Sequence, residues 1–144
     1  MKNNQVKIIQ ACSAVDWRDV PRLLKAGGMS YRASAVHRRA FENSFAVVFL
    51  FDGERLIGFG RAISDGQYQS AIYDVVVAPV YQGRGLGLRI VKTLLRRLPK
   101  NGNVILYASP GKEGFYERIG FCRMRTGMAL FQDMGKMRAR GFVY

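Results

Sequence analysis

Apolar and polar positions in the first half of the chain follow the pattern of consecutive strands. Residues Phe45–Phe51 form an unbroken apolar run rich in β-branched and aromatic side chains, as in a strand buried on both faces. The dipeptide Asp52-Gly53 follows, and further strand patterns cover Arg55–Ile63 and, after a second turn at Asp65-Gly66, Gln69–Val77. Because Asp-Gly between two apolar runs favours a tight hairpin, we expect three antiparallel strands in a row.

After Pro79 the spacing of apolar residues becomes that of a helix. Leucine or isoleucine recurs at every fourth position from Leu86 to Leu98, which predicts an amphipathic helix that ends before Pro99. The other predicted elements are strands at Val6–Gln10, Val104–Ala108, Cys122–Arg125 and Met128–Phe131, and helices from Ser13 or Asp16 to Ala26, over Ser30–Asn43 and over Lys112–Ile119. This order predicts a single α/β domain over residues 1–144, with a mixed, mostly antiparallel sheet flanked by helices on both faces.

Composition narrows the classes of protein. The 144 residues include 23 Lys and Arg against 10 Asp and Glu, a formal net charge of +13 that predicts an anionic partner. Two cysteines, Cys12 and Cys122, and one histidine, His37, are too few for a disulfide scaffold or a Cys/His zinc site, so no metal is expected. The apolar runs are too short to span a bilayer, and the first ten residues lack the apolar region of a signal peptide. We therefore expect a cytoplasmic protein with no membrane segment.

The segment Tyr73–Leu88, YDVVVAPVYQGRGLGL, has the pattern of a strand that leads through a glycine-rich loop into a helix. Glycine permits positive φ and a close approach to the backbone, and the unpaired N–H groups at a helix N-terminus favour an anion. The loop therefore predicts a phosphate-binding site. It is not the dinucleotide fingerprint, because Leu88 stands where that motif needs its third glycine, and no Gly-Lys-Ser/Thr of a P-loop is present.

Within this segment, Gln82–Gly87 (QGRGLG) resembles the Q/R-x-x-G-x-G/A pyrophosphate loop of the GNAT superfamily of N-acetyltransferases. Val75–Pro79 resembles that family's central strand, and Gly114–Phe121 (GFYERIGF) resembles its F-Y-x-x-x-G-F helix. The order of elements is similar from Val6 to Phe131. The segment from Tyr73 is also similar to bacterial members of unassigned substrate and to plant plastid arylalkylamine (serotonin) N-acetyltransferases. The resemblance implies the acyl-CoA N-acyltransferase (GNAT) fold and transfer of an acetyl group from acetyl-coenzyme A to a primary amine.

The resemblance also implies how the coenzyme is held. The backbone of Val75, Val76 and Val77 is expected to pair with the pantetheine arm, and the N–H of Val77 to polarise the thioester carbonyl. The pyrophosphate is expected on Gln82, Gly83, Arg84, Gly85, Leu86 and Gly87, mainly through backbone N–H groups. The family often has Asn seven residues before the tyrosine of its F-Y motif, where this chain has Ser109, so the coenzyme contact expected at Ser109 departs from the pattern.

Two catalytic residues are expected. Tyr116 matches the family's general-acid tyrosine, which would protonate the departing thiolate and also contact the coenzyme. Asp74 is the candidate base, although simple strand alternation puts it on the opposite face from Tyr73, Val75 and Val77 unless a β-bulge intervenes. Tyr81 is a weaker candidate base, a water chain is another, and a structural hydrogen-bonding role for Asp74 is the alternative.

Tyr31 and Tyr73 are the residues expected to contact the acceptor amine. His37, next to two arginines on a polar helix, is expected to be a surface residue rather than a base, and Cys122 a core residue rather than a nucleophile. Arg89, Lys92, Arg96, Arg97 and Lys100 are expected to form either a solvated helix face or a contact for the 3′-phosphate of the coenzyme.

Two other functions compete with acetyl transfer. A GNAT fold could bind an acyl-coenzyme A as a sensor without turnover. The lack of an obvious base leaves this function open, whereas Tyr116, the expected general acid, argues against it. The net charge could also serve nucleic-acid binding, but the chain lacks a helix-turn-helix pattern and RNP-type aromatic motifs. A homodimer is expected because the segment Gln132–Tyr144 ends in apolar residues that a solitary tail would expose.

Overall fold

The computed structural model describes residues 5–144 as two compact units, one ending at Leu106 and the other running from Tyr107 to Tyr144. The first unit contains strands β1 (Val6–Ile9), β2 (Ala46–Asp52), β3 (Arg55–Ser64), β4 (Gln69–Val77) and β5 (Asn103–Ile105), helices α1 (Asp19–Ala26), α2 (Ser34–Glu42) and α3 (Leu86–Arg97), and the 3-10 helix η2 (Pro79–Tyr81). The second contains the short helices α4 (Glu113–Glu117) and α5 (Met134–Ala139).

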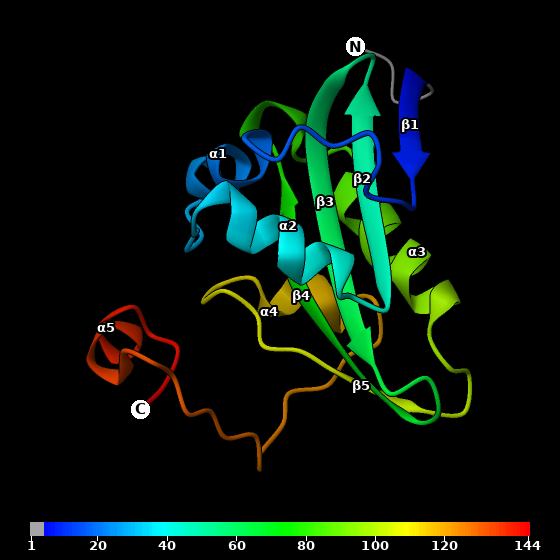
Figure 1. Cartoon of the computed structure of the whole chain (residues 1–144). Coiled ribbons are helices and arrows are strands. Elements are labelled where there is room, and N and C mark those ends of the chain that lie inside the picture. Colours follow the sequence, from blue (N-terminus) through cyan, green and yellow to red (C-terminus); the bar gives the residue numbers. More distant parts are fainter. Residues whose placement is uncertain (1–4) are drawn as a thin grey trace. The chain divides into compact units, whose positions relative to one another are not determined.

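The first unit is built on one mixed sheet with the strand order β1-β2-β3-β4-β5 (Figure 1). Strands β1 to β4 pair antiparallel with their neighbours, and β5 pairs parallel with β4. Asp52 pairs with Arg55 at the end of the β2–β3 hairpin. The turn between them contains Gly53, which has φ +60°. The three antiparallel strands and the Asp-Gly turn that the sequence predicts are confirmed.

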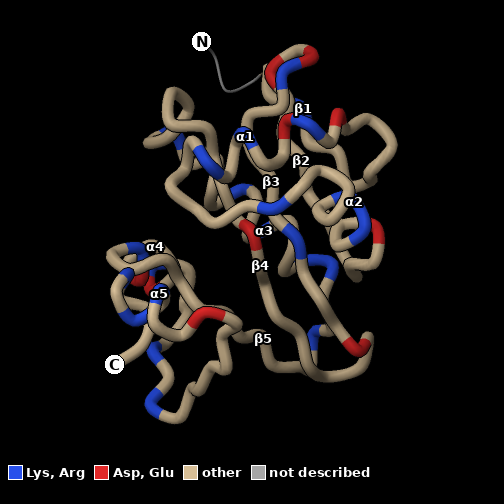
Figure 2. The backbone as a smooth tube through the Cα atoms, turned by 60° about the vertical axis from the view of Figure 1, so that its left-hand side comes forward, with Lys and Arg blue, Asp and Glu red and all other residues tan. Residues whose placement is uncertain are grey.

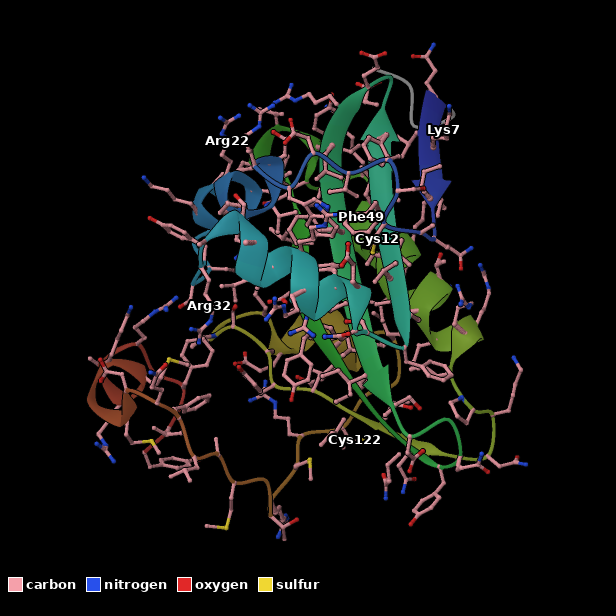
Figure 3. The ribbon with its side chains drawn as sticks, viewed as in Figure 1. Lys7, Cys12, Arg22, Arg32, Phe49 and Cys122 are labelled. Atoms are coloured by element: carbon pink, nitrogen blue, oxygen red, sulfur yellow. The ribbon has the colours of Figure 1, made fainter. Side chains whose placement is uncertain are left out.

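Helices cover both faces of this sheet, α1 and α2 on one and α3 on the other (Figure 1). On the α2 side, Trp17, Phe41, Phe49 and Phe59 form an aromatic core with ring centroids 5.3–6.2 Å apart. Phe49 extends from β2 toward α2 in this layer (Figure 3). Because both faces are covered, β2 is buried along almost its whole length, which explains its continuous apolar sequence.

Glycines in β3 let α3 pack closely against the other face. A Cβ atom on Gly60 would lie 2.7 Å from the Ile90 side chain, and one on Gly58 would lie 3.4 Å from it. The apolar stripe of α3 fits this surface, since Leu86, Ile90 and Leu94 are buried. The helix that the spacing predicts from Leu86 to Leu98 is therefore confirmed, with its end at Arg97.

Two helix boundaries differ from the sequence prediction. α1 begins at Asp19, and its N-cap is Arg18 rather than Ser13 or Asp16. The Asp16 carboxylate instead accepts the backbone N–H and the guanidinium of Arg18, which holds a turn before the helix. Pro21 then falls in the first turn, where its missing N–H costs no helical hydrogen bond. α2 begins at Ser34, four residues later than predicted.

The second unit has aromatic packing but no sheet. Tyr107, Phe131 and Phe142 contact one another edge to face, with centroids 5.5–6.3 Å apart. Residues 122–131 contain no strand, so the predicted strands at Cys122–Arg125 and Met128–Phe131 are wrong. A strand needs a partner for its backbone groups, and the apolar residues of these short runs do not guarantee one. α5 was not predicted, although Asp133 caps it by accepting the N–H of Lys136 at 2.9 Å.

Candidate functional site

The last part of β4 has a strand neighbour on one side only. β3 pairs with β4 from Ser70 to Val77, whereas the parallel pairing with β5 stops at Ala71. Within the described chain, Ile72–Val77 therefore has no strand partner on the β5 side. Backbone N–H and C=O groups along such an edge are available to an extended ligand that adds to the sheet as a strand would.

A β-bulge interrupts β4 along this open stretch. Phe59 pairs with Val76 and Arg61 with Tyr73, so Asp74 and Val75 together face Gly60. Asp74 has φ +57°, the left-handed conformation that Asp and Asn tolerate best after glycine. A bulge at this place is what the sequence requires for Asp74 to leave the face that simple alternation gives it.

The bulge changes which side chains share a face. Val75 points toward α3, because a Cβ on Gly60 would meet both the Val75 side chain, at 3.2 Å, and Ile90 of α3. Val76 points toward α1, because its side chain would lie 2.6 Å from a Cβ on Gly27, the residue after that helix. Tyr73 contacts Arg61, which also lies over Phe41 of α2. The expectation that Tyr73 and Val75 share one face is therefore wrong, because the extra residue shifts the alternation.

Asp74 is paired with a single arginine. Its Oδ2 accepts the Nε–H of Arg61 at 2.7 Å, and both side chains are largely shielded from solvent. The same guanidinium reaches the Ser44 hydroxyl at 3.4 Å and covers the rings of Phe41 and Tyr73. This network joins the bulge to α2 and occupies one carboxylate oxygen of the candidate base.

His37 is buried beside this network, so the prediction of a surface histidine is wrong. Its Nε2 accepts the backbone N–H of Arg32 at 2.9 Å. Burial lowers the pKa of His37, the Asp74 carboxylate acts in the opposite direction, and the charges of Arg61 and Arg32 lower the pKa further. A neutral ring with Nε2 as the acceptor carries its proton on Nδ1. The hydrophobic spacing of α2 was the available signal, because His37 lies four residues before buried Phe41.

The glycine loop has the backbone of an anion cradle. Gly83 and Gly85 have φ +79° and +77°, and a Cβ at either position would meet no atom within 4 Å. Gly85 is the N-cap of α3 and has no side chain with which to cap the N–H groups of the first turn. Gln82 donates from its side chain to the Val77 carbonyl at 3.0 Å, which ties the loop to the end of β4. These features fit a coenzyme pyrophosphate.

Ser109 and Tyr116 belong to the second unit. Tyr116 lies on α4 between the rings of Phe115 and Phe121, whose centroids are 4.9 and 5.9 Å away. Burial raises the pKa of Tyr116, so its hydroxyl keeps its proton at neutral pH. The Ser109 carbonyl accepts the N–H of Lys112 in the turn before α4. Cys122 is exposed, so the prediction of a core cysteine is wrong.

Tyr31 lies in the segment between α1 and α2, half exposed. The next residue, Arg32, donates its backbone N–H to His37, so the histidine fixes the segment that carries Tyr31. Across residues 5–144, no three or more His, Cys, Asp or Glu side chains are grouped to hold a metal ion. In the same residues, no helix is long and apolar enough to cross a bilayer.

Comparison with known proteins agrees with this geometry. A family model described as an acetyltransferase (GNAT) domain matches residues 27–130. The chain belongs to the GNAT acetyltransferase family. The crystal structure of a protein of unknown function from meticillin-resistant Staphylococcus aureus, described as a probable acetyltransferase, superposes with a TM-score of 0.78 at 27% identity, covering 88% of this chain and 98% of the other. The GNAT fold predicted from the motifs is confirmed.

Relatives of this GNAT protein differ in what their names assign to them. The ycf52-like N-acetyltransferase of Prochlorococcus marinus is 36% identical over 113 residues, covering 74% of this chain and 63% of the relative. The chloroplastic serotonin N-acetyltransferase 2 of Oryza sativa is 42% identical over 106 residues, covering 67% of this chain and 52% of the relative. The chain therefore spans between about half and two thirds of the length of these relatives.

Proposed function

We propose that this GNAT protein is an enzyme that transfers an acetyl group from acetyl-coenzyme A to a primary amine. The observation that carries the proposal is the open edge of β4. The strand is followed by η2 and then by the glycine cradle at the start of α3. A pantetheine arm along Val75–Val77 would leave its pyrophosphate at Gln82–Gly87. The family model covers residues from both units, which supports their acting together as one catalytic domain.

The backbone supplies the contacts in this proposal. Val75 and Val77 offer backbone groups to the pantetheine at the open edge, whereas those of Val76 face its pairing partner Phe59 in β3. The Val77 N–H polarises the thioester carbonyl as an oxyanion-hole donor does. The N–H groups of Gly83, Gly85, Leu86 and Gly87 meet the pyrophosphate, aided by the partial positive charge of the α3 N-terminus. Gln82 supports the loop through Val77, and Ser109 adds a contact from the second unit.

Acetyl transfer to an ammonium group removes two protons from the nitrogen, one before attack and one as the amide forms, and adds one proton to the sulfur. An alkylamine with a pKa of about 10 must lose a proton before its nitrogen attacks the thioester carbon. When the tetrahedral species collapses, the C–S bond breaks and the sulfur takes a proton. We propose Tyr116 as the donor, because burial keeps its hydroxyl protonated. Solvent then restores the tyrosine proton.

Asp74 is the proposed acceptor of the amine proton, but its geometry also gives it a structural role. Its Oδ2 is bound to Arg61, so the proton must reach the other oxygen, directly or through water. His37 uses its Nε2 lone pair for Arg32 and is not available as a base at that nitrogen. Asp74→Asn keeps the side-chain shape at positive φ. A loss of kcat together with the acidic limb of its pH profile would assign the base, and an unchanged profile would leave only the structural role.

The acceptor class that we propose is an aryl-alkyl amine, and two aromatic side chains support it. Tyr31 and Tyr73 offer aromatic surface, which suits an aryl-alkyl amine such as the one named for the rice relative. A protein amine is the second class. The high positive charge of the chain disfavours a polyamine, since like charges repel.

The decisive experiment is thiol release from acetyl-coenzyme A in the presence of an amine panel. The panel contains an arylalkylamine, a lysine-containing peptide and a polyamine. We expect turnover that depends on an amine, fastest with one of the first two. Binding of acetyl-coenzyme A without turnover on any amine would indicate a sensor, and no binding at all would refute the proposed function.

A further inference from the structure

Tyr81 is a buried aromatic residue directly before the glycine cradle. It is the last residue of η2 and is only 2% exposed, although Gln82 and Gly83 next to it are exposed. The backbone N–H of Tyr81 bonds the Ala78 carbonyl, and that of Gln82 bonds the Pro79 carbonyl. Tyr81 thus marks the point where the protein interior ends and the loop begins.

The Tyr81 hydroxyl ties η2 to the β2–β3 hairpin. It donates to Oδ2 of Asp52 at 2.6 Å, the short distance typical of a hydroxyl bound to a carboxylate. This bond raises the pKa of Tyr81, so the hydroxyl remains a donor throughout the neutral range. Asp52 is the last residue of β2 and is paired with Arg55 across the turn, which gives the bond a rigid base.

The ring of Tyr81 also holds a loop side chain. The guanidinium of Arg84 lies 5.4 Å from the ring centroid, and its NH2 group donates to the Val80 carbonyl at 3.2 Å. The guanidinium of Arg55 lies 5.6 Å from the same centroid. Arg84 therefore folds back over η2, which fixes the middle of a loop whose two positive-φ glycines would otherwise leave it free to rearrange.

We propose that Tyr81 is a positioning residue that preorganises the cradle for the coenzyme pyrophosphate. It acts through Asp52 on one side and Arg84 on the other. A loop that is already ordered loses less conformational entropy when a ligand binds, so Tyr81 should increase the affinity for the coenzyme. The chemical step is not involved. This inference rests on the proposed function, but the order of the loop is measurable without any ligand.

The test compares Tyr81→Phe, which keeps the ring and removes the hydroxyl, with Tyr68→Phe in the exposed β3–β4 turn as the control. Two acetyl donors are used: acetyl-coenzyme A and S-acetylpantetheine, which lacks the pyrophosphate. For Tyr81→Phe we expect KM for acetyl-coenzyme A and Kd for coenzyme A to rise by about tenfold, in the range of one hydrogen bond to a charged group. We expect unchanged kcat and unchanged kcat/KM for S-acetylpantetheine. Tyr68→Phe should match the wild type throughout.

A double variant tests the route of the effect. Asp52→Asn combined with Tyr81→Phe should weaken coenzyme binding no more than Tyr81→Phe alone, because both remove the same bond. Equal losses with both acetyl donors, or a fall in kcat at constant KM, would overturn the positioning role and place Tyr81 in the chemistry or in general stability.

Hydrogen exchange separates this inference from the proposed function. In the ligand-free protein, the amides of Tyr81, Gln82 and Arg89 are bonded to backbone carbonyls at the two ends of the loop. Tyr81→Phe should accelerate their exchange, while amides of β2 keep the wild-type rate. Unchanged exchange would overturn the inference even if the enzyme is active. Faster exchange in a protein that binds no coenzyme A would refute the proposed function and leave the loop tether standing.

Discussion

Tyr116 is the proposed general acid, and its role is the easiest to test at the scale of one residue. Its ring packs against Phe115 and Phe121, so Tyr116→Phe preserves the packing and removes only the hydroxyl. We expect kcat to fall by roughly 10²-fold, the lower end of general acid–base catalysis, with coenzyme affinity and stability nearly unchanged. Single-turnover rates at saturating acetyl-coenzyme A measure this step directly.

The pH profile gives a check on the same residue. Because burial raises the pKa of Tyr116, ionisation of this hydroxyl should not reduce kcat below about pH 10. If Tyr116→Phe retains the full rate when chemistry limits turnover, the tyrosine is structural. Tyr107 would then be the next hydroxyl group to test, because that of Tyr81 is bound to Asp52.

His37 predicts a dependence of stability on pH. Its pKa is lowered on folding, so between the folded value and about 6.5 the unfolded chain binds more protons than the folded one. The free energy of unfolding should therefore fall as the pH drops below about 6.5 and be constant with respect to this group above it. Urea unfolding followed by the fluorescence of Trp17, which packs on Phe41 of α2, measures the effect.

The control for this prediction is His37→Gln, which removes the only histidine of the chain and whose side chain is long enough to place an amide oxygen where Nε2 accepts the Arg32 N–H. The slope just below pH 6.5 should disappear in this variant. The same slope in both proteins would mean that another group titrates there.

At this scale the sequence was informative where a motif constrains the backbone. The cradle at Gln82–Gly87 could be located because glycine is required at positive φ, and the structure has that backbone at Gly83 and Gly85. The surroundings of His37 could not be found in the same way. Its burial depends on β3 and β4, which bring Arg61 and Asp74 to α2 from far along the chain.

Among the elements, the contact between β3 and α3 makes a strong prediction about packing. A Cβ on Gly60 would lie 2.7 Å from Ile90, 3.2 Å from Val75 and 3.3 Å from Leu94. Gly60→Val should therefore lower the free energy of unfolding by about 1–3 kcal/mol, the usual cost of overpacking a core. Ile63→Val, at a half-exposed position of the same strand, should change it by less than about 0.5 kcal/mol. Equal urea midpoints for the two variants would show that α3 does not pack closely on Gly60.

Elements with strong periodicity were predictable, and those fixed by tertiary pairing were not. β2, β3, β4 and α3 agree with the sequence within two residues at each end, because their burial dictates the pattern. The run at 122–125 alternates and the run at 128–131 is continuously apolar, but neither has a strand partner, and a partner cannot be predicted from so short a run. The bulge at Asp74 is a similar case, since it depends on the register between β3 and β4.

For the whole molecule, charge is the dominant feature. Lysine and arginine are spread through the chain, and acidic residues are few (Figure 2). A polyphosphate ligand such as coenzyme A suits this balance. Association with that ligand should weaken as salt rises, because screening reduces the attraction between opposite charges.

The homodimer stays a prediction, but the exposed apolar residues that support it are different ones. Phe142 packs on Tyr107 and Phe131, so the tail that the sequence indicated is bare only at Tyr144. Met128 and Leu130, at 98% and 97% exposure, are now the apolar residues to be covered. Sedimentation at tens of micromolar, roughly the range that detects moderate affinity, should give a dimer, and Met128→Ser with Leu130→Ser a monomer. A monomeric wild type at that concentration would contradict the prediction.

The central claim is that the loop before α3 holds the pyrophosphate of acetyl-coenzyme A, and calorimetric titration with coenzyme A tests it most directly. Gly85→Glu places a carboxylate at the cradle, and Gly66→Glu makes the same change at a glycine of nearly equal φ in the β3–β4 turn. With folding of both variants verified by circular dichroism, the wild type and Gly66→Glu should bind coenzyme A with similar affinity, and Gly85→Glu should lose at least about tenfold. Equal affinity of folded Gly85→Glu and wild type would contradict the account.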